Sequence, residues 1–264
     1  MSQHFDNTVR LSSLLVDPAS LVVPYERYPR SLPFFFEPSM MPLVPQEPAG
    51  AQEPLVQMDP RRISIVAAYH HAGLEDSTRC AHLRQGAAAR VYTAASTLPD
   101  GFGLAVLDAW RPLSLQQRLH ESALRNATDP RYVSEPSRDP ATPPPHLTGG
   151  AVDVTLTWNG APLRLGTAFD DFSVEAHSAS HETKSGLVRE LRRLLYWAMR
   201  DQGFVVLDSE WWHFEFGTRR WAALNNCDPL YGPASLPTRL YAASFSGDEQ
   251  VVSQQEADVV HICP

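Results

Sequence analysis

Four residues in two short segments have the types that a hydrolytic zinc site needs. His146 and Asp153 lie in HLTGGAVD, and Glu210 and His213 lie in EWWH. Two imidazoles and one carboxylate, from His146, Asp153 and His213, can bind one Zn²⁺ and leave the fourth position open for water. Glu210 is then a spare carboxylate that can accept a proton from that water.

A third segment, DAWRP, adds a cation to this set. Arg111 follows an apolar run that is typical of a buried strand, and Asp108 precedes it by three residues. Asp108 can hold the guanidinium in place, and we expect it to lie next to the metal ligands without binding the metal itself. Arg111 can then face an oxyanion that develops during hydrolysis. Taken alone, the pair is also compatible with a purely structural salt bridge.

The spacing of the first two ligands requires a sharp turn. His146 and Asp153 are seven residues apart, and Gly149 and Gly150 lie between them. Glycine permits backbone conformations that other residues avoid, so the chain can turn from a loop into a strand and direct both side chains at one ion. A surface histidine followed by an ordinary turn is the alternative.

The spacing of Glu210 and His213 sets a second geometric condition. Residues three apart in a regular strand face opposite sides, so both reach one site only if the strand is bulged, bent or ending there. Trp211 and Trp212 would exclude water and strengthen the electrostatics of the site, although a core aromatic pair is the alternative. Glu215 is a competing carboxylate on the same segment, which we rank below Glu210.

Helices and strands are expected around these segments. The patterns predict helices over 84–98, 111–126 and 185–203, strands over 103–110 and 151–158, an interrupted strand over 204–216, and a loop over 129–145. Asn159-Gly160 predicts a hairpin turn. In the last helix, Ser185 is the expected N-cap and Gly203 the expected end. Its apolar face should consist of Leu187, Leu191, Leu194, Leu195 and Ala198.

Composition narrows the class of protein. The 264 residues carry a net charge of −8, which argues against a nucleic-acid partner. No apolar run is long enough for a membrane span, and the first ten residues do not resemble a signal peptide, so we expect a cytoplasmic protein with no membrane partner. The three cysteines are widely spaced, which fits a reducing compartment.

Proline content divides the chain. Residues 1–60 hold ten of the 23 prolines, and we expect them to form an extended arm that wraps the main domain. The apolar cluster LPFFF at 32–36 suggests that this arm packs against another surface. Residues 61–240 would form the main domain, which carries the candidate zinc site. Residues 241–264 would be a C-terminal tail, for which disorder is an open alternative.

Four segments in order, DAWRP, PPHLTGGAVD, LGTAFD and EWWH, resemble the D-Ala-D-Ala dipeptidases, the VanX-like branch of the M15 zinc peptidases. The resemblance covers residues 80–216. It implies an α+β fold of the hedgehog/DD-peptidase type, in which a small antiparallel sheet carries the zinc site and helices flank it. The roles it implies are zinc ligation by His146, Asp153 and His213, a general base at Glu210, an oxyanion-facing Arg111, and Asp170 as the partner of the substrate's free ammonium group.

The resemblance implies hydrolysis of a short peptide, D-alanyl-D-alanine in the first place, with one Zn²⁺ per chain and a role in cell-wall peptide chemistry. One departure concerns specificity. The family commonly has serine two residues before the first histidine ligand, and here that residue is Pro144, which offers no hydroxyl. A related zinc D,D-carboxypeptidase, a dipeptidase for another substrate, and a non-catalytic zinc-binding interaction module therefore remain alternatives. The oligomeric state, including a homo-oligomer, stays open.

Overall fold

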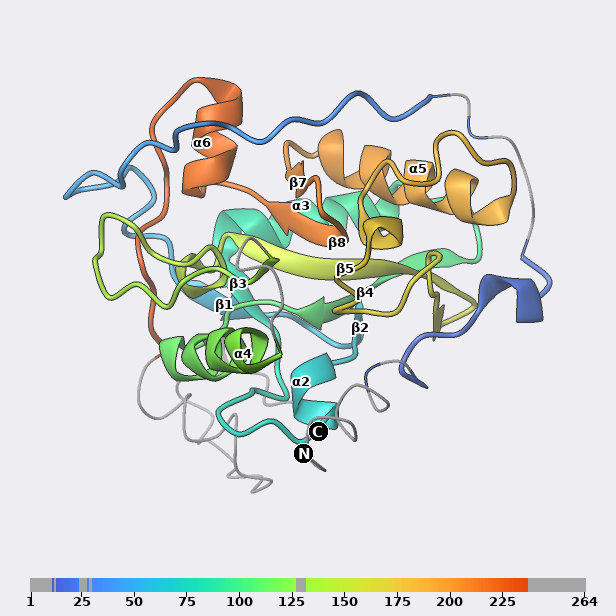
Figure 1. Cartoon of the computed structure of the whole chain (residues 1–264), viewed down its shortest axis with the longest axis horizontal. Coiled ribbons are helices and arrows are strands. Elements are labelled where there is room, and N and C mark those ends of the chain that lie inside the picture. Colours follow the sequence, from blue (N-terminus) through green and yellow to red (C-terminus); the bar gives the residue numbers. More distant parts are fainter. Residues whose placement is uncertain (1–10, 12, 24–27, 29, 127–131, 237–264) are drawn as a thin grey trace.

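The computed structural model describes residues 11, 13–23, 28, 30–126 and 132–236. The expected tail, 241–264, lies outside them. The described residues include five α-helices and two sheets, which gives a mixed fold in which helices pack on sheets (Figure 1). Among the described helices, none has the length and apolar character that a bilayer span requires.

The central sheet has six strands in the order β2-β4-β5-β8-β7, with β6 paired to β5. Its strands are β2 (Ser64–Ile65), β4 (Phe102–Asp108), β5 (Ala151–Trp158), β6 (Ala161–Pro162), β7 (Val205–Leu207) and β8 (Glu210–Glu215). The expectation of an antiparallel sheet is correct for every pair except β2 and β4, which are parallel. A helical crossover connects these two strands and returns the chain in the same direction, as parallel pairing requires.

A smaller sheet pairs β1 (Leu55–Gln57) with β3 (His82–Arg84) in antiparallel register. The hairpin between β5 and β6 turns at Asn159 and Gly160, both at positive φ, as the Asn-Gly pair predicts. Strand β5 is buried along its first seven residues. It occupies the middle of the sheet and therefore anchors the residues on either side of it.

The helices cover both faces of the central sheet (Figure 1). They are α2 (Ala68–His71), α3 (Gln85–Ser96), α4 (Leu113–Arg125), α5 (Leu187–Arg200) and α6 (Arg219–Asn225). Helices α3 and α5 lie together on one side, and α2 and α4 lie on the other. In α5 the expected apolar face packs into the core: Leu191, Leu195 and Ala198 are buried. Leu187 and Leu194 are half-buried against the same core.

Both ends of α5 differ from expectation. Ser185 does not cap the helix, because the cap position is Gly186, whose φ of 127° no other residue adopts easily and which offers no side-chain hydrogen bond. At the C-terminal side the helix ends at Arg200 and its cap is Asp201, so Gly203 lies two residues beyond the cap. Gly203 has a φ of 87° and its N–H donates to the carbonyl of Arg200.

The described part of the arm crosses the sheet edge and then the outer face of α5 (Figure 1). Val16 bridges to Leu163 beside β6. Further along, the guanidinium of Arg30 stacks on the ring of Trp197, at 3.4 Å from its centroid. Only one ring of the LPFFF cluster packs against the main domain: Phe35 meets Tyr196, whereas Phe34 and Phe36 are exposed.

The turn between η3 (His146–Thr148) and β5 leaves no space for larger residues. Gly149 ends the 3₁₀ turn at a φ of 72°, in the left-handed region. A Cβ on Gly150 would overlap the carbonyl oxygen of Phe216 and lie 2.9 Å from Cδ2 of Tyr231. The two glycines therefore allow the sharp path that the sequence predicts between His146 and Asp153.

We predict that Gly150→Ala destabilises the protein by about 1–3 kcal/mol, because the added methyl group overlaps the backbone of a neighbouring strand end. Urea denaturation of the variant measures this loss. Gly232→Ala is the matched control: a Cβ there meets only ordinary contacts, at 3.6 and 3.8 Å, so its effect should stay within about 0.5 kcal/mol. Equal stability of the two variants would contradict the crowding argument.

Candidate active site

Two carboxylate side chains and one imidazole lie in one row across the central sheet. Asp108 on β4 pairs with Asp153 on β5, and Asp153 pairs with His213 on β8. The register of β4 shifts between Val106 and Asp108, as in a β-bulge, and this places Asp108 opposite Asp153. Strand pairing alone thus brings residues from distant parts of the sequence to one place.

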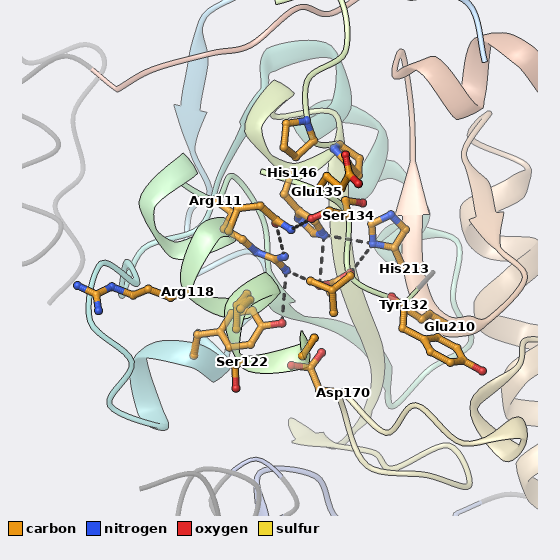
Figure 2. A pocket seen from close by; sticks show the side chains of 18 of the residues that line it. Arg111, Arg118, Ser122, Tyr132, Ser134, Glu135, His146, Asp170, Glu210 and His213 are labelled. Atoms are coloured by element: carbon orange, nitrogen blue, oxygen red, sulfur yellow. Dashed lines mark hydrogen bonds and ion pairs between the residues drawn. The ribbon is translucent and has the colours of Figure 1, made fainter. Parts of the chain in front are cut away.

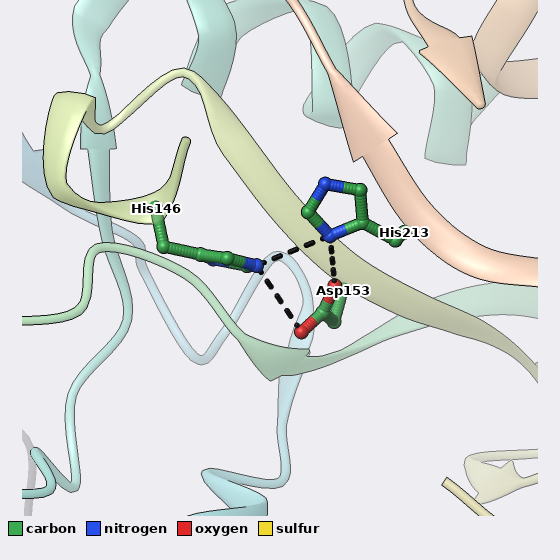
Figure 3. Close-up of side chains that lie close together, drawn as sticks. All are labelled: His146, Asp153 and His213. Carbon is green, nitrogen blue, oxygen red and sulfur yellow. Dashed lines mark hydrogen bonds and ion pairs between the residues drawn. The ribbon is translucent and has the colours of Figure 1, made fainter. Parts of the chain in front are cut away.

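His146 completes the group from the 3₁₀ turn that precedes β5 (Figure 3). Its Nε2 lies 3.1 Å from Nδ1 of His213 and 3.4 Å from Oδ2 of Asp153. Nδ1 of His213 lies 2.9 Å from Oδ1 of Asp153. All three side chains are buried, and the structure brings together the three ligands that the sequence predicts.

The remaining ring nitrogens fix which atoms face the centre. Nδ1 of His146 donates to the carbonyl oxygen of Ala109 at 2.7 Å. Nε2 of His213 donates to a carboxylate oxygen of Glu215 at 3.1 Å. Each ring is therefore held so that its other nitrogen faces the centre with a lone pair, as in metal-binding histidines whose second nitrogen is hydrogen-bonded.

This donor set fits a metal ion. Two nitrogen lone pairs and a carboxylate converge, an arrangement that is repulsive without a positive charge between them. Their separations of 2.9, 3.1 and 3.4 Å are close to the distance of about 3.3 Å between neighbouring ligands of a tetrahedral zinc ion. The site thus has the size and chemistry of a three-ligand metal centre.

The pKa values of the cluster support the same conclusion. Burial alone would lower the pKa of His213, but its hydrogen bonds to Asp153 and Glu215 outweigh burial and raise the pKa to about 10. Burial acts to raise the pKa of Asp153, yet the two histidines lower it below its usual range. The cluster therefore stabilises positive charge at its centre, which a proton or a metal ion can supply.

Arg111 lies beside the cluster and is almost fully buried (Figure 2). Its Nε donates to Asp108 at 2.9 Å, and one terminal nitrogen donates to Gln116 at 2.8 Å. The other terminal nitrogen lies 3.7 Å from Asp153 and 3.4 Å from the hydroxyl of Tyr69. Asp108 thus holds Arg111 as expected, and the guanidinium edge that remains faces the metal ligands.

Glu210 shares the cavity with the cluster because β8 is irregular. Val206 pairs with Phe214, but the next residue, Leu207, pairs with Glu210, so three residues of β8 have no partner on β7. This is the interruption that the spacing of Glu210 and His213 requires. Glu210 is 7% exposed, and burial raises the pKa of its carboxyl to about 8.

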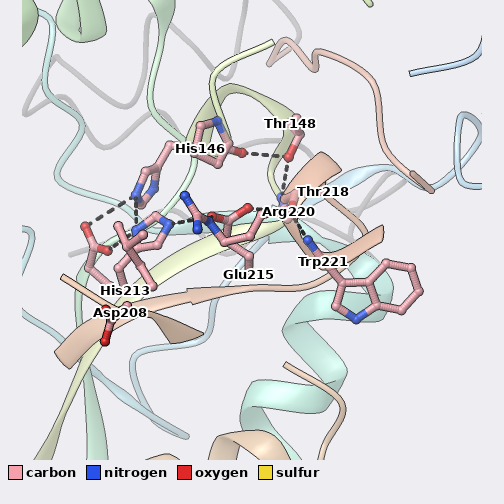
Figure 4. Close-up of polar contacts among 12 residues, drawn as sticks. His146, Thr148, Asp208, His213, Glu215, Thr218, Arg220 and Trp221 are labelled. Carbon is pink, nitrogen blue, oxygen red and sulfur yellow. Dashed lines mark hydrogen bonds and ion pairs between the residues drawn. The ribbon is translucent and has the colours of Figure 1, made fainter. Parts of the chain in front are cut away.

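Glu215 plays a part that the sequence reasoning missed (Figure 4). It does not reach the metal position. Instead one oxygen accepts from Nε2 of His213, and the other accepts from the hydroxyl of Thr218. Arg220 donates to the first oxygen at 2.9 Å. The carboxylate therefore orients His213, a function that its position two residues further on the same strand could have indicated.

Asp170 and Tyr69 form the opposite wall of the site. Asp170 has a φ of 58°, a left-handed conformation that aspartate tolerates better than most residues, and its carboxyl group faces the cavity (Figure 2). Burial raises its pKa to about 7, although Arg111 and the hydroxyl of Tyr69 act in the opposite direction. Tyr69, whose ring packs on Phe169 at 5.5 Å, stands between Arg111 and Asp170. No motif in the sequence pointed to it.

One cavity of about 1380 Å³ joins these groups, and Pro144 lies on its wall. Arg111, Asp170, Glu210 and the three expected metal ligands all line it. Trp211 and Trp212 do not line it but pack behind its wall. Trp212 meets Phe169 edge-on at 5.5 Å, and the indole of Trp211 donates to Thr167 at 2.9 Å.

Comparisons with known proteins indicate the family of this chain. A family model described as D-Ala-D-Ala dipeptidase, of the M15 peptidases, matches residues 70–227. A D-alanyl-D-alanine dipeptidase of Synechocystis sp. is 30% identical over 175 residues, which cover 53% of this chain and 71% of that protein.

A D-alanyl-D-alanine dipeptidase of Escherichia coli is 35% identical over 117 residues, which cover 44% of this chain and 56% of that protein. The residues that the family model matches include all the expected metal ligands, Glu210, Arg111 and Asp170, and exclude the arm. The chain belongs to the D-Ala-D-Ala dipeptidase family of M15 peptidases.

Proposed function

We propose that this protein is a zinc-dependent dipeptidase that hydrolyses D-alanyl-D-alanine. The buried cluster of His146, Asp153 and His213, sharing one cavity with Glu210 and Arg111, is the observation that carries the proposal. The names of the two relatives supply the substrate. A zinc ion held by the three ligands would lower the pKa of a water molecule toward neutrality and polarise the peptide carbonyl.

Glu210 is the proposed general base. Its pKa of about 8 lies near neutral pH, where a carboxyl group can both accept and release a proton. It would take a proton from the attacking water and then give it to the nitrogen of the leaving amino acid. Burial makes the largest contribution to this raised pKa. An exposed glutamate has a lower pKa and is therefore a weaker proton acceptor at neutral pH.

Arg111 is the proposed partner of the oxyanion. Its orientation is fixed before substrate binds, because Asp108 and Gln116 hold two of its nitrogens. A donor that is already oriented stabilises the charge developing on the carbonyl oxygen without reorganisation during the reaction. Burial strengthens this interaction, since little water competes for the guanidinium.

Asp170 is the proposed anchor of the substrate's amino terminus. A carboxylate in a buried site binds an ammonium group strongly, because the alternative is an unpaired buried charge. An anchor at this place limits the number of residues before the scissile bond, which is what distinguishes a dipeptidase from an endopeptidase.

A related zinc D,D-carboxypeptidase is the second candidate, and the cavity favours it. The cavity of about 1380 Å³ exceeds the roughly 300–1000 Å³ that is usual for small-molecule sites. Pro144 also removes the hydroxyl that the family commonly offers. Longer peptides that end in D-Ala-D-Ala would fill more of this space than the free dipeptide does.

We predict that the purified protein binds one zinc ion per chain and that Glu210→Gln keeps the ion but lowers D-Ala-D-Ala turnover about 10²- to 10⁴-fold. The amide retains the shape of the side chain but cannot accept the proton. Metal analysis and turnover on the same samples measure both effects. Glu135→Gln, at an exposed position on the cavity wall, is the control and should keep wild-type turnover. A Glu210→Gln variant with near-normal turnover would contradict the assignment of the base.

We predict that Asp170→Asn raises the KM for D-Ala-D-Ala at least tenfold, because the ammonium group loses its charged partner. Asparagine also tolerates the left-handed backbone at this position, so the fold should be kept. The wild type should prefer the free dipeptide over its N-acetyl derivative, and the variant should lose that preference. If the wild type instead cleaves N-acetylated and longer D-Ala-D-Ala peptides better than the free dipeptide, the protein is a carboxypeptidase and the dipeptidase assignment is wrong.

A further inference from the structure

The N-terminal arm contacts the helix that follows β8. Residues 37–42 of the arm run past the first turn of α6, where two successive arginines bind them. Arg219 donates to the carbonyl oxygens of Met41 at 3.0 Å and Pro42 at 2.8 Å. Arg220 forms an ion pair with the carboxylate of Glu37. Glu37 also accepts from the backbone N–H of Asp208, at 3.4 Å, near the start of β8.

The same arginine reaches the metal cluster from its other side (Figure 4). Nε of Arg220 donates to Glu215 at 2.9 Å, and that carboxylate oxygen accepts from Nε2 of His213 at 3.1 Å. An unbroken series of polar contacts therefore runs from the arm to the ring that faces the metal position. Glu215 is 2% exposed, so its charge depends on these partners rather than on water.

The geometry of a guanidinium makes the two contacts dependent on each other. The group is planar and rigid, so a partner on one nitrogen restricts the orientation of the others. Glu37 binds a terminal nitrogen and Glu215 binds Nε. Without Glu37, Arg220 retains its charge but has more freedom to turn, and its hydrogen bond to Glu215 becomes less well fixed.

We propose that residues 37–42 of the arm are a positioning element of the metal site: Glu37 holds Arg220, Arg220 holds Glu215, and Glu215 holds the ligand His213. Partners of metal-binding histidines tune metal affinity because they fix the orientation of the ring. The arm lies outside residues 70–227, which match the family model, so this support comes from outside the matched part of the chain. The proposal rests on the metal site put forward above.

The test compares Zn²⁺ affinity, measured by competition with a chelator, in full-length variants. Glu37→Gln should weaken Zn²⁺ binding roughly 3- to 10-fold, somewhat less than the 10–100-fold that is typical when a histidine loses its direct partner. Glu37→Asp should restore part of the loss. Glu47→Gln, an exposed position on the same arm with the same change of charge, is the control and should match the wild type.

Two further measurements separate positioning from a general effect on folding. The visible spectrum of the Co²⁺-loaded protein should change in Glu37→Gln, because it reports the geometry of the ligands. A purely structural role would instead lower the stability to urea and leave the spectrum unchanged. Glu37→Gln should also add no further loss of Zn²⁺ affinity in an Arg220→Gln background, since the two residues act in series.

The outcomes distinguish this proposal from the metal site itself. Tight Zn²⁺ binding by the wild type together with unchanged affinity in Glu37→Gln would overturn the role of the arm alone. Additive losses in the double variant would do the same. A wild type that binds no Zn²⁺ would overturn both the metal site and the positioning element.

Discussion

The convergence of three electron-pair donors is the constraint on which the rest of this site depends. His146, Asp153 and His213 lie at mutual distances of 2.9–3.4 Å and are shielded from water. Such a group forms only if other parts of the protein hold it against its own repulsion. Strand pairing fixes Asp153 and His213, and the turn at Gly149 and Gly150 delivers His146. The surrounding hydrogen bonds then determine which nitrogen of each ring faces inward.

Charge balance extends this argument to the whole cavity. Five carboxylates and two guanidiniums surround the site: Asp108, Asp153, Asp170, Glu210 and Glu215 with Arg111 and Arg220. If all were ionised, negative charges would exceed positive ones by three. The raised pKa values of Asp108, Asp170 and Glu210 reflect burial in this environment. A divalent cation together with an ammonium group would supply the three positive charges, which is the combination that a zinc dipeptidase brings together.

Local patterns could predict the parts of the fold and of the site that lie within one element or one turn. The apolar face of α5, the hairpin at Asn159-Gly160 and the sharp turn after His146 all follow from neighbouring residues, and the structure has each of them. The strand irregularity at Glu210 could also be predicted, because two functional residues three apart cannot otherwise face one cavity. The parallel pairing of β2 could not, since a strand of two residues leaves almost no pattern.

Contacts between distant segments could not be predicted from the sequence, for a physical reason. Tyr69 reaches Arg111 across 42 positions, and Glu37 reaches Arg220 across 183. Neither residue belongs to a motif, because hydrogen bonds of this kind depend on the fold rather than on spacing along the chain. Glu215 is the intermediate case. Its segment was recognised, but whether it would bind a metal or orient a histidine was decided by which ring nitrogen faced it. Chemistry that depends on neighbouring residues is thus more easily predicted from a sequence than the long-range contacts that hold the reacting groups in place.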